Sequence, residues 1–231
     1  LIALLVKGHE QDGAVKTDKA AYLNSILSLT ILVLNHHHVL RGENFNQKPF
    51  YRLYSTILCE LDAFEEGLSE EERQDITLVF ARIFLKIPPT HFPGFMTSWM
   101  SLISHRKFLP VVLALPKQVG WGLFADLMEK LLFYLGELLK PVIHLDPTTS
   151  QIYRGVIKLV IILHHDFPEF LSANHSKLCV HVPSYSTQLN NLILSATPPQ
   201  IADMPNPMQP GLKLDRVGEI RQSPDSMNDV E

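Results

Sequence analysis

Two groups of histidines contain the residue types that metal binding or acid–base chemistry would need. His36, His37 and His38 are consecutive, and His164 and His165 directly precede Asp166. Zinc ligands on one helix require a spacing of three or four residues, because adjacent helical side chains diverge by about 100°. No acidic or cysteine ligand lies at such a spacing from the first group. We therefore interpret these histidines as a polar helix end, where imidazole also interacts favourably with the helix dipole.

Two further patterns could indicate catalysis or cofactor binding. A carboxylate beside imidazoles, as at His164–Asp166, would suit acid–base work, but no nucleophile can be paired with it. Gly120-Trp121-Gly122-Leu123-Phe124-Ala125 matches a loose dinucleotide-binding pattern. That pattern requires a strand leading into its first glycine, and Pro116 interrupts the segment where the strand would lie. We expect no enzyme activity, no cofactor and no bound metal.

Composition and charge exclude several classes of protein. The 231 residues are 46% apolar and 19% charged, which is typical of a globular chain and excludes wholesale disorder. The net charge is −4 and the basic residues are scattered, so we expect no direct contact with nucleic acid. The apolar run 20–40 contains two asparagines and three histidines, which disfavours a membrane span. Cys59 and Cys179 indicate buried free thiols in a reducing compartment.

Helix start and stop signals dominate the chain. Asp18 is a cap for a helix that reaches about residue 40 and ends near Gly42. Ser69 and Glu72 form a capping box, and Pro88-Pro89 ends the helix that follows it. Further helices are expected over about 50–61, 95–105, 122–139 and 188–196, with a capped start at Asp146-Pro147 and a short helical turn from Pro168. The β-branched run 156–163 fits a strand as well, although we favour a helix because it continues from that cap.

Successive helices of this length with short connections are typical of HEAT-like pairs, although the self-similarity is poor. We predict an all-α fold, an irregular HEAT-like (helical-hairpin) stack, over residues 1–198. Beyond Pro198, proline, asparagine, serine and methionine replace the periodic pattern. Residues 199–231 are therefore expected to form an extended, partly disordered C-terminal tail.

Several long, ordered motifs carry a resemblance to a known family. They are Pro93-Gly94-Phe95 with Trp99 and Leu102-Ile103-Ser104-His105-Arg106; His165-Asp166-Phe167-Pro168-Glu169-Phe170-Leu171; Gln188-Leu189-Asn190-Asn191-Leu192-Ile193-Leu194-Ser195-Ala196; and Met204-Pro205-Asn206-Pro207-Met208-Gln209-Pro210-Gly211-Leu212-Lys213-Leu214-Asp215 with Glu219-Ile220. Together they resemble the C-terminal domain of the Not-one family, the scaffold subunits of the CCR–Not deadenylase complex, and a fungal member in particular. The resemblance covers about residues 76–220.

The resemblance implies a HEAT-like domain without catalytic activity that forms part of a larger hetero-oligomeric complex. It implies docking of the Not-box subunits, Not-two and Not-three or Not-five, through extended segments, and in fungi a contact with the tail of the Not-four ubiquitin ligase. The domain would thereby support mRNA deadenylation, mRNA decay and translational repression in the cytoplasm, with the nucleus as a second location. The chain departs from the family pattern at Asn190, Thr197 and 206–210.

A stack of helix pairs offers grooves in which an extended partner chain can place apolar anchors. We expect surface aromatics and arginines near the helix breaks to bind such a chain, namely Arg106, Phe108, Trp121 and Arg154. Two alternatives stay open. A helical RNA or helicase docking platform of the translation-factor middle-domain type predicts salt-sensitive RNA binding, and a metal hydrolase using His164–Asp166 predicts stoichiometric metal.

Overall fold

The computed structural model describes residues 18–63, 68–140, 146–183 and 186–196, and all regular structure in these ranges is helical. The prediction of an all-α fold is therefore confirmed. The helices are α2 (Lys19–Arg41), α3 (Lys48–Ala63), α4 (Glu70–Lys86), α5 (Met96–Ile103), α6 (Leu109–Leu113), α7 (Val119–Leu138), α8 (Pro147–Asp166), α9 (Pro168–His181) and α10 (Thr187–Leu194). Short 3₁₀ turns are η1 (Gly42–Asn44), η2 (Pro93–Phe95) and η3 (Pro116–Gln118).

The chain divides into two units, Leu1–Gly155 and Val156–Glu231, so that α8 contributes to both. The predicted boundary between the helical domain and its tail, at residues 198 and 199, lies outside the described residues. So do the first apolar segment, residues 1–6, and the whole of the tail. The division into residues 1–198 and 199–231 stays a prediction.

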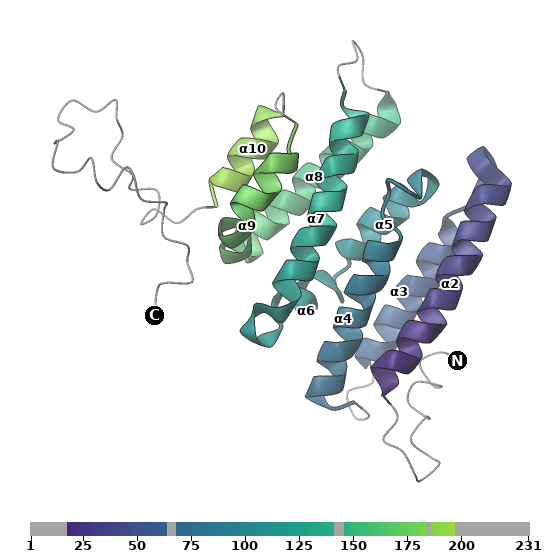
Figure 1. The fold of residues 1–231 in the computed structure, drawn as a ribbon. Helices are drawn as coiled ribbons and strands as arrows, with labels where there is room; N and C mark the ends of the chain where they lie inside the picture. Colours follow the sequence, from purple (N-terminus) through teal and green to yellow (C-terminus); the bar gives the residue numbers. More distant parts are fainter. Residues whose placement is uncertain (1–17, 64–67, 141–145, 184–185, 197–231) are drawn as a thin grey trace, which may run out of the picture. The chain divides into compact units, whose positions relative to one another are not determined.

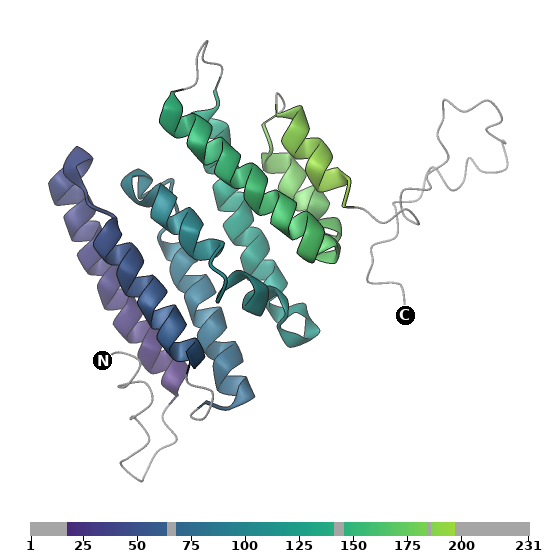
Figure 2. The ribbon, with the colours of Figure 1, turned by 180° about the vertical axis from the view of Figure 1, so that it is seen from behind.

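The first unit is built from two layers of helices. In one layer α4 lies between α2 and α7, and in the other α3 pairs with α5 (Figures 1 and 2). The short helix α6 packs against both α4 and α7. Successive helices thus alternate between layers, which is the geometry of stacked helical hairpins and confirms the HEAT-like prediction.

Local sequence signals set the helix ends as expected. The Asp18 carboxylate accepts hydrogen bonds from the N–H groups of Ala20 and Ala21 at the start of α2. At the other end of α2, Gly42 has a φ of 47°, a left-handed conformation that glycine adopts without steric cost. The capping box of Ser69 and Glu72 is present in full, with bonds of 2.8 and 3.2 Å.

A row of aromatic rings fills the core of the first unit. Tyr54 contacts Phe84 at a ring-centroid distance of 6.1 Å, Phe84 contacts Phe108 at 5.1 Å, and Phe108 contacts Phe124 at 6.4 Å. All four side chains are completely buried. Burial of each such side chain stabilises the fold by about 1.5–3 kcal/mol. The row therefore links α3, α4 and α7 through the residue that precedes α6.

In the second unit, α9 and α10 pack against each other. The β-branched run 156–163 lies within α8, so the preference for a helix is confirmed. The expectation of a short helical turn from Pro168 is wrong, because Pro168 begins a helix of 14 residues. Proline is tolerated in the first turn of a helix. The side chains of Phe170, Leu171 and Leu178 are buried along one side of α9 and hold the helix in place. Polar residues separate these apolar positions, so the sequence does not show a clear helical period here.

The structure describes both cysteines of the chain. Cys59 and Cys179 are free, as expected, but both are half-buried rather than buried. Burial raises the pKa of the Cys179 thiol.

Within the described ranges, no helix combines the length and the apolar character that crossing a membrane requires.

Candidate partner-binding pocket

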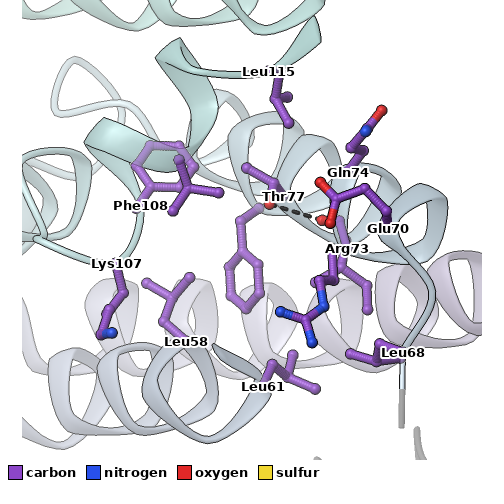
Figure 3. Close-up of a pocket in the computed structure, with 13 residues that line it drawn as sticks. Leu58, Leu61, Leu68, Glu70, Arg73, Gln74, Thr77, Lys107, Phe108 and Leu115 are labelled. Atoms are coloured by element: carbon purple, nitrogen blue, oxygen red, sulfur yellow. Dashed lines mark hydrogen bonds between the residues drawn. The ribbon is translucent and has the colours of Figure 1, made fainter. Parts of the chain in front are cut away.

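A pocket of about 230 Å³ opens in the first unit between α3, α4 and α6 (Figure 3). Its walls are largely aliphatic and aromatic, and polar groups stand among them. The apolar lining consists of Leu58, Leu61, Leu68, Ile76, Phe80, Phe108, Val111 and Leu115, and the polar lining of Glu70, Arg73, Gln74, Thr77 and Lys107.

Helical spacing explains how the sequence forms the two main walls. Leu58 and Leu61 are three residues apart on α3 and face the same way. On α4, Arg73, Thr77 and Phe80 recur at spacings of four and three. Thr77 donates its hydroxyl proton to the Arg73 carbonyl at 2.8 Å, as the dashed line in Figure 3 shows. The hydroxyl is thereby satisfied within its own helix, and the methyl group adds to the apolar wall.

The pocket has a size and a lining that suit an apolar side chain. Its volume is below the range of about 300–1,000 Å³ that is usual for small-molecule sites. Among the described residues, the titratable groups that line it are Glu70, Arg73 and Lys107, and these include no histidine, cysteine or paired carboxylates. The arrangement therefore fits an anchor from a docked polypeptide, with polar groups placed to bond the chain beside it.

Of the four residues predicted to bind a partner, only Phe108 lines this pocket. Its placement on the surface is wrong, because the side chain is 0% exposed and forms part of the aromatic row. The residue directly precedes α6, where packing between Phe84 and Phe124 draws the ring inward. Arg106, two residues earlier, is exposed, as expected.

Trp121 is half-buried, and its indole N–H donates to the Leu113 carbonyl at 2.9 Å. This bond ties the first turn of α7 to the end of α6. Arg154 is exposed on α8 and does not line the pocket. A role of Arg106, Phe108, Trp121 and Arg154 in partner binding stays a prediction.

Sequence patterns do not identify most of the pocket wall, including Leu58, Leu61 and Val111. The apolar stripe of α3 was visible in the sequence, but it indicates burial without showing whether the neighbouring helices fill all the space beside it. Leu58 and Leu61 are each only 6% exposed, and both line the pocket.

In the first histidine group, His37 and His38 pack against phenylalanine rings. The His38 ring contacts Phe45 and Phe92 at centroid distances of 5.1 and 5.4 Å, and His37 contacts Phe50 at 6.0 Å. In the part of the chain that the structure describes, histidine, cysteine, aspartate and glutamate side chains form no cluster of three or more that could hold a metal ion.

The second histidine group separates into two unrelated pairs. His165 Nδ1 lies 2.6 Å from the Asp166 carboxylate, and both side chains are exposed. His164 Nε2 lies 3.1 Å from the Ser195 hydroxyl, whose own proton is donated to the Leu192 carbonyl. The tautomer of His164 decides which of these two groups donates, and the Ser195 hydroxyl already has the Leu192 carbonyl as an acceptor.

Similarity to known proteins is extensive. The family model described as "CCR4-Not complex component, Not1" matches residues 58–231. General negative regulator of transcription subunit 1 is 30% identical in Saccharomyces cerevisiae and 35% identical in Schizosaccharomyces pombe, over 96% and 95% of this chain. The matched regions are 11% and 10% of those proteins. CCR4-NOT transcription complex subunit let-711 of Caenorhabditis elegans is 28% identical over 98% of this chain and 9% of its own length.

Two solved structures share the fold. The NOT1 superfamily homology domain from Chaetomium thermophilum aligns with a TM-score of 0.79 at 39% identity, over 96% of this chain and 42% of that one. A Not1 C-terminal domain in complex with Not4 aligns with a TM-score of 0.71 at 29% identity, over 94% of this chain and 43% of that one.

The chain thus spans about a tenth of the length of the curated relatives that it matches. Because the family model covers more than half of the sequence, including the helices that form the pocket wall from α4 onward, the resemblance noted in the motifs is confirmed. The chain belongs to the Not1 family of CCR4-Not complex components.

Proposed function

We propose that this domain is a non-catalytic scaffold of the CCR4-Not complex that docks partner subunits along its helical stack. The expected partners are the Not-box proteins Not-two and Not-three or Not-five, together with the Not-four ubiquitin ligase. Through them the domain supports mRNA deadenylation, mRNA decay and translational repression in the cytoplasm, and also in the nucleus. A relative with 29% identity is known in complex with Not4, which supports the choice of that partner.

The observation that carries the proposal is the pocket between α3, α4 and α6, where an apolar wall adjoins polar side chains on one open surface. An extended partner chain loses conformational entropy when it binds, so it needs apolar anchors that enter preformed pockets. The half-buried Val111 lies at the wall of this pocket and is accessible to such an anchor.

Blocking the pocket without disturbing the core tests the proposal. Val111→Arg places a long side chain in the pocket, whereas Ala114→Arg adds the same charge at an exposed position directly after α6 that does not line the pocket. Binding of purified Not-two, Not-five and the C-terminal segment of Not-four is measured separately for each variant. Thermal unfolding verifies that both variants are folded.

We expect Val111→Arg to weaken at least one partner by about tenfold or more, equivalent to about 1.4 kcal/mol, and Ala114→Arg to bind like the parent. Equal binding by the two variants would remove the pocket from the docking surface. Failure of the parent domain to bind any of the three partners would remove the scaffold function itself. Shortening of a polyadenylated RNA by the isolated domain would contradict the absence of catalysis.

A further inference from the structure

A second surface of the first unit has a different chemical character. An open hollow of about 490 Å³ lies between the end of α4, the turn after it and α7, two helices that run side by side in Figure 1. Its lining consists of Leu85, Lys86, Pro88, Thr90, His91, Lys130 and Phe133. None of these described lining residues is acidic, although the chain as a whole has a net charge of −4.

The two lysine side chains at the hollow, and the histidine beside them, are accessible to a ligand. Lys86, His91 and Lys130 are exposed, and among the described residues no hydrogen bond or ion pair engages any of these three side chains. Lys86 lies in the last turn of α4, where the helix dipole contributes about half a negative charge. Two lysine charges exceed that contribution, so the hollow keeps a positive potential.

Neighbouring acidic residues on α7 do not cancel this charge. Glu137, one turn beyond Phe133, forms an ion pair with Lys140. Asp126, one turn before Lys130, also has an interaction with another residue. Glu129, which directly precedes Lys130, also has an interaction with another residue. Within the described part of the chain, no ion pair joins any of these carboxylates to Lys86 or Lys130.

The hollow also has an apolar surface. Phe133 is 50% exposed although it is a large aromatic residue, and Leu85 and Pro88 lie beside it in the lining. An exposed phenyl ring next to unpaired lysines can contact an apolar side chain while the lysines bind carboxylates on either side of it. We propose that this hollow binds an acidic peptide segment that carries a single aromatic or aliphatic anchor. The proposal relies on the scaffold function only in assigning a protein as the ligand.

An acidic peptide fits this surface better than RNA does. Binding of a nucleic-acid backbone needs a stripe of lysine and arginine, because affinity comes from neutralising successive phosphates. The hollow contains two lysines, one histidine and no arginine among its described lining residues. Its one phenyl ring and one imidazole also form no extended platform for stacking a series of bases.

Fluorescence anisotropy tests the proposal on the isolated domain. The probe is a fluorescein-labelled synthetic peptide with a central phenylalanine flanked by aspartate and glutamate. Control peptides replace the phenylalanine by serine or the acidic residues by lysine. The domain variants are Lys86→Glu/Lys130→Glu and Phe133→Ser. Lys117→Glu/Lys158→Glu is the matched control, because it changes the net charge equally at exposed positions outside the hollow.

We expect the acidic probe to bind the parent and the matched control equally, and to bind Lys86→Glu/Lys130→Glu at least about tenfold more weakly. Phe133→Ser and the serine probe should each reduce affinity by about threefold or more, and binding should weaken as salt is raised. Absence of probe binding, equal loss in the matched control, or tighter binding of a labelled oligoadenylate would each overturn the proposal. Because no Not-box or Not-four protein is present, these outcomes are independent of the scaffold test.

Discussion

Trp99 donates its indole N–H to the Phe84 carbonyl at 2.9 Å, and both side chains are completely buried. Within α4 this carbonyl would accept from the residue four positions later, which is Pro88, and proline has no N–H. The N–H of Ile87 approaches it only at 3.3 Å. The proline that ends α4 thus leaves this carbonyl with only one long backbone hydrogen bond, and a tryptophan on α5 supplies a second, shorter one.

Replacing Trp99 with phenylalanine should destabilise the fold by about 2–4 kcal/mol, because it leaves a buried carbonyl poorly bonded and a cavity beside it. Trp121→Phe is the matched variant, since Trp121 also donates to a helix-end carbonyl but is half-buried. Its expected cost is about 1 kcal/mol. Urea unfolding measures both values, and equal costs would contradict the role assigned to Pro88.

The two glycines at the start of α7 should respond oppositely to alanine. A Cβ added to Gly120 would lie 2.0 Å from the Val112 carbonyl oxygen, so the backbones of α6 and α7 would have to separate. We expect Gly120→Ala to cost about 1–3 kcal/mol. A Cβ on Gly122 meets nothing within 4 Å, so Gly122→Ala should stabilise the domain by about 0.5–1 kcal/mol. Chemical denaturation of both variants measures these changes, and a Gly120→Ala variant as stable as the parent would contradict close helix packing as the reason for Gly120.

Lys19 and Glu72 join the starts of α2 and α4 through an ion pair of 3.1 Å, with the lysine almost completely buried. Glu72→Gln should destabilise the domain by about 2–3 kcal/mol, because it replaces the charged partner of a buried ammonium by a neutral one. Lys19→Met should cost less, since it removes the buried charge itself. Thermal unfolding of both variants checks this order, and a larger loss for Lys19→Met would contradict it.

Acid should weaken this pair only well below neutrality. The Ser69 N–H and the Lys19 ammonium hold the pKa of the Glu72 carboxyl below its ordinary value. The contribution of Glu72 is therefore complete above the ordinary pKa and is lost as the pH falls through the lowered one.

His105 connects the turn before α6 to α3. Its Nδ1 accepts from the Lys107 N–H at 3.2 Å, so Nε2 carries the proton and donates to the Ser55 hydroxyl at 3.3 Å. Partial burial, together with the nearby charges of Arg106 and Lys107, lowers the pKa of His105 below its ordinary value of 6.5. Between the lowered value and 6.5 the unfolded chain binds more protons, so His105 makes the fold less stable as the pH falls through this range.

His105→Gln retains hydrogen-bonding groups but removes the titration. As the pH is lowered from about 7 to about 5, the Tm of the variant should fall less than the Tm of the parent. Above about pH 7 the two Tm values should change with pH in the same way. Thermal scans at matched ionic strength measure the difference. Parallel pH profiles for parent and variant would contradict the assignment.

The outward face of α2 should tolerate polar residues. Leu29, Leu32 and Leu40 are 62%, 65% and 68% exposed, whereas Leu27 is completely buried. Leu29→Gln/Leu32→Gln should change the free energy of unfolding by less than about 0.5 kcal/mol per site and reduce self-association. Leu27→Ala should cost about 2–5 kcal/mol. Denaturant unfolding with light scattering tests both statements, and a large loss from the double variant would show that this face is packed.

The sequence predicted where helices begin and end because those signals are local. Each signal acts on backbone groups within a few residues of it. In the structure, Asp18 caps α2, the Ser69–Glu72 box caps α4, and α4 ends just before Pro88. The same locality explains the error at Pro168, where the stripe that extends α9 was too interrupted to show its period. Ordered motifs spanning residues 76–220 were also sufficient to predict the family.

The candidate site could be predicted only in part. Phe108 was named but placed on the surface, and Leu58 and Val111 were not named. Apolar periodicity shows that a residue prefers burial, but it does not show which neighbour covers it.

Only the tertiary structure decided that Phe108 is buried while Leu29 is exposed, that Gly120 is in close contact with Val112, and that two lysines from α4 and α7 lie at one hollow. Each of these facts depends on residues distant in sequence. Helix boundaries follow from backbone hydrogen bonding along the chain, whereas pockets and surfaces follow from the way helices pack.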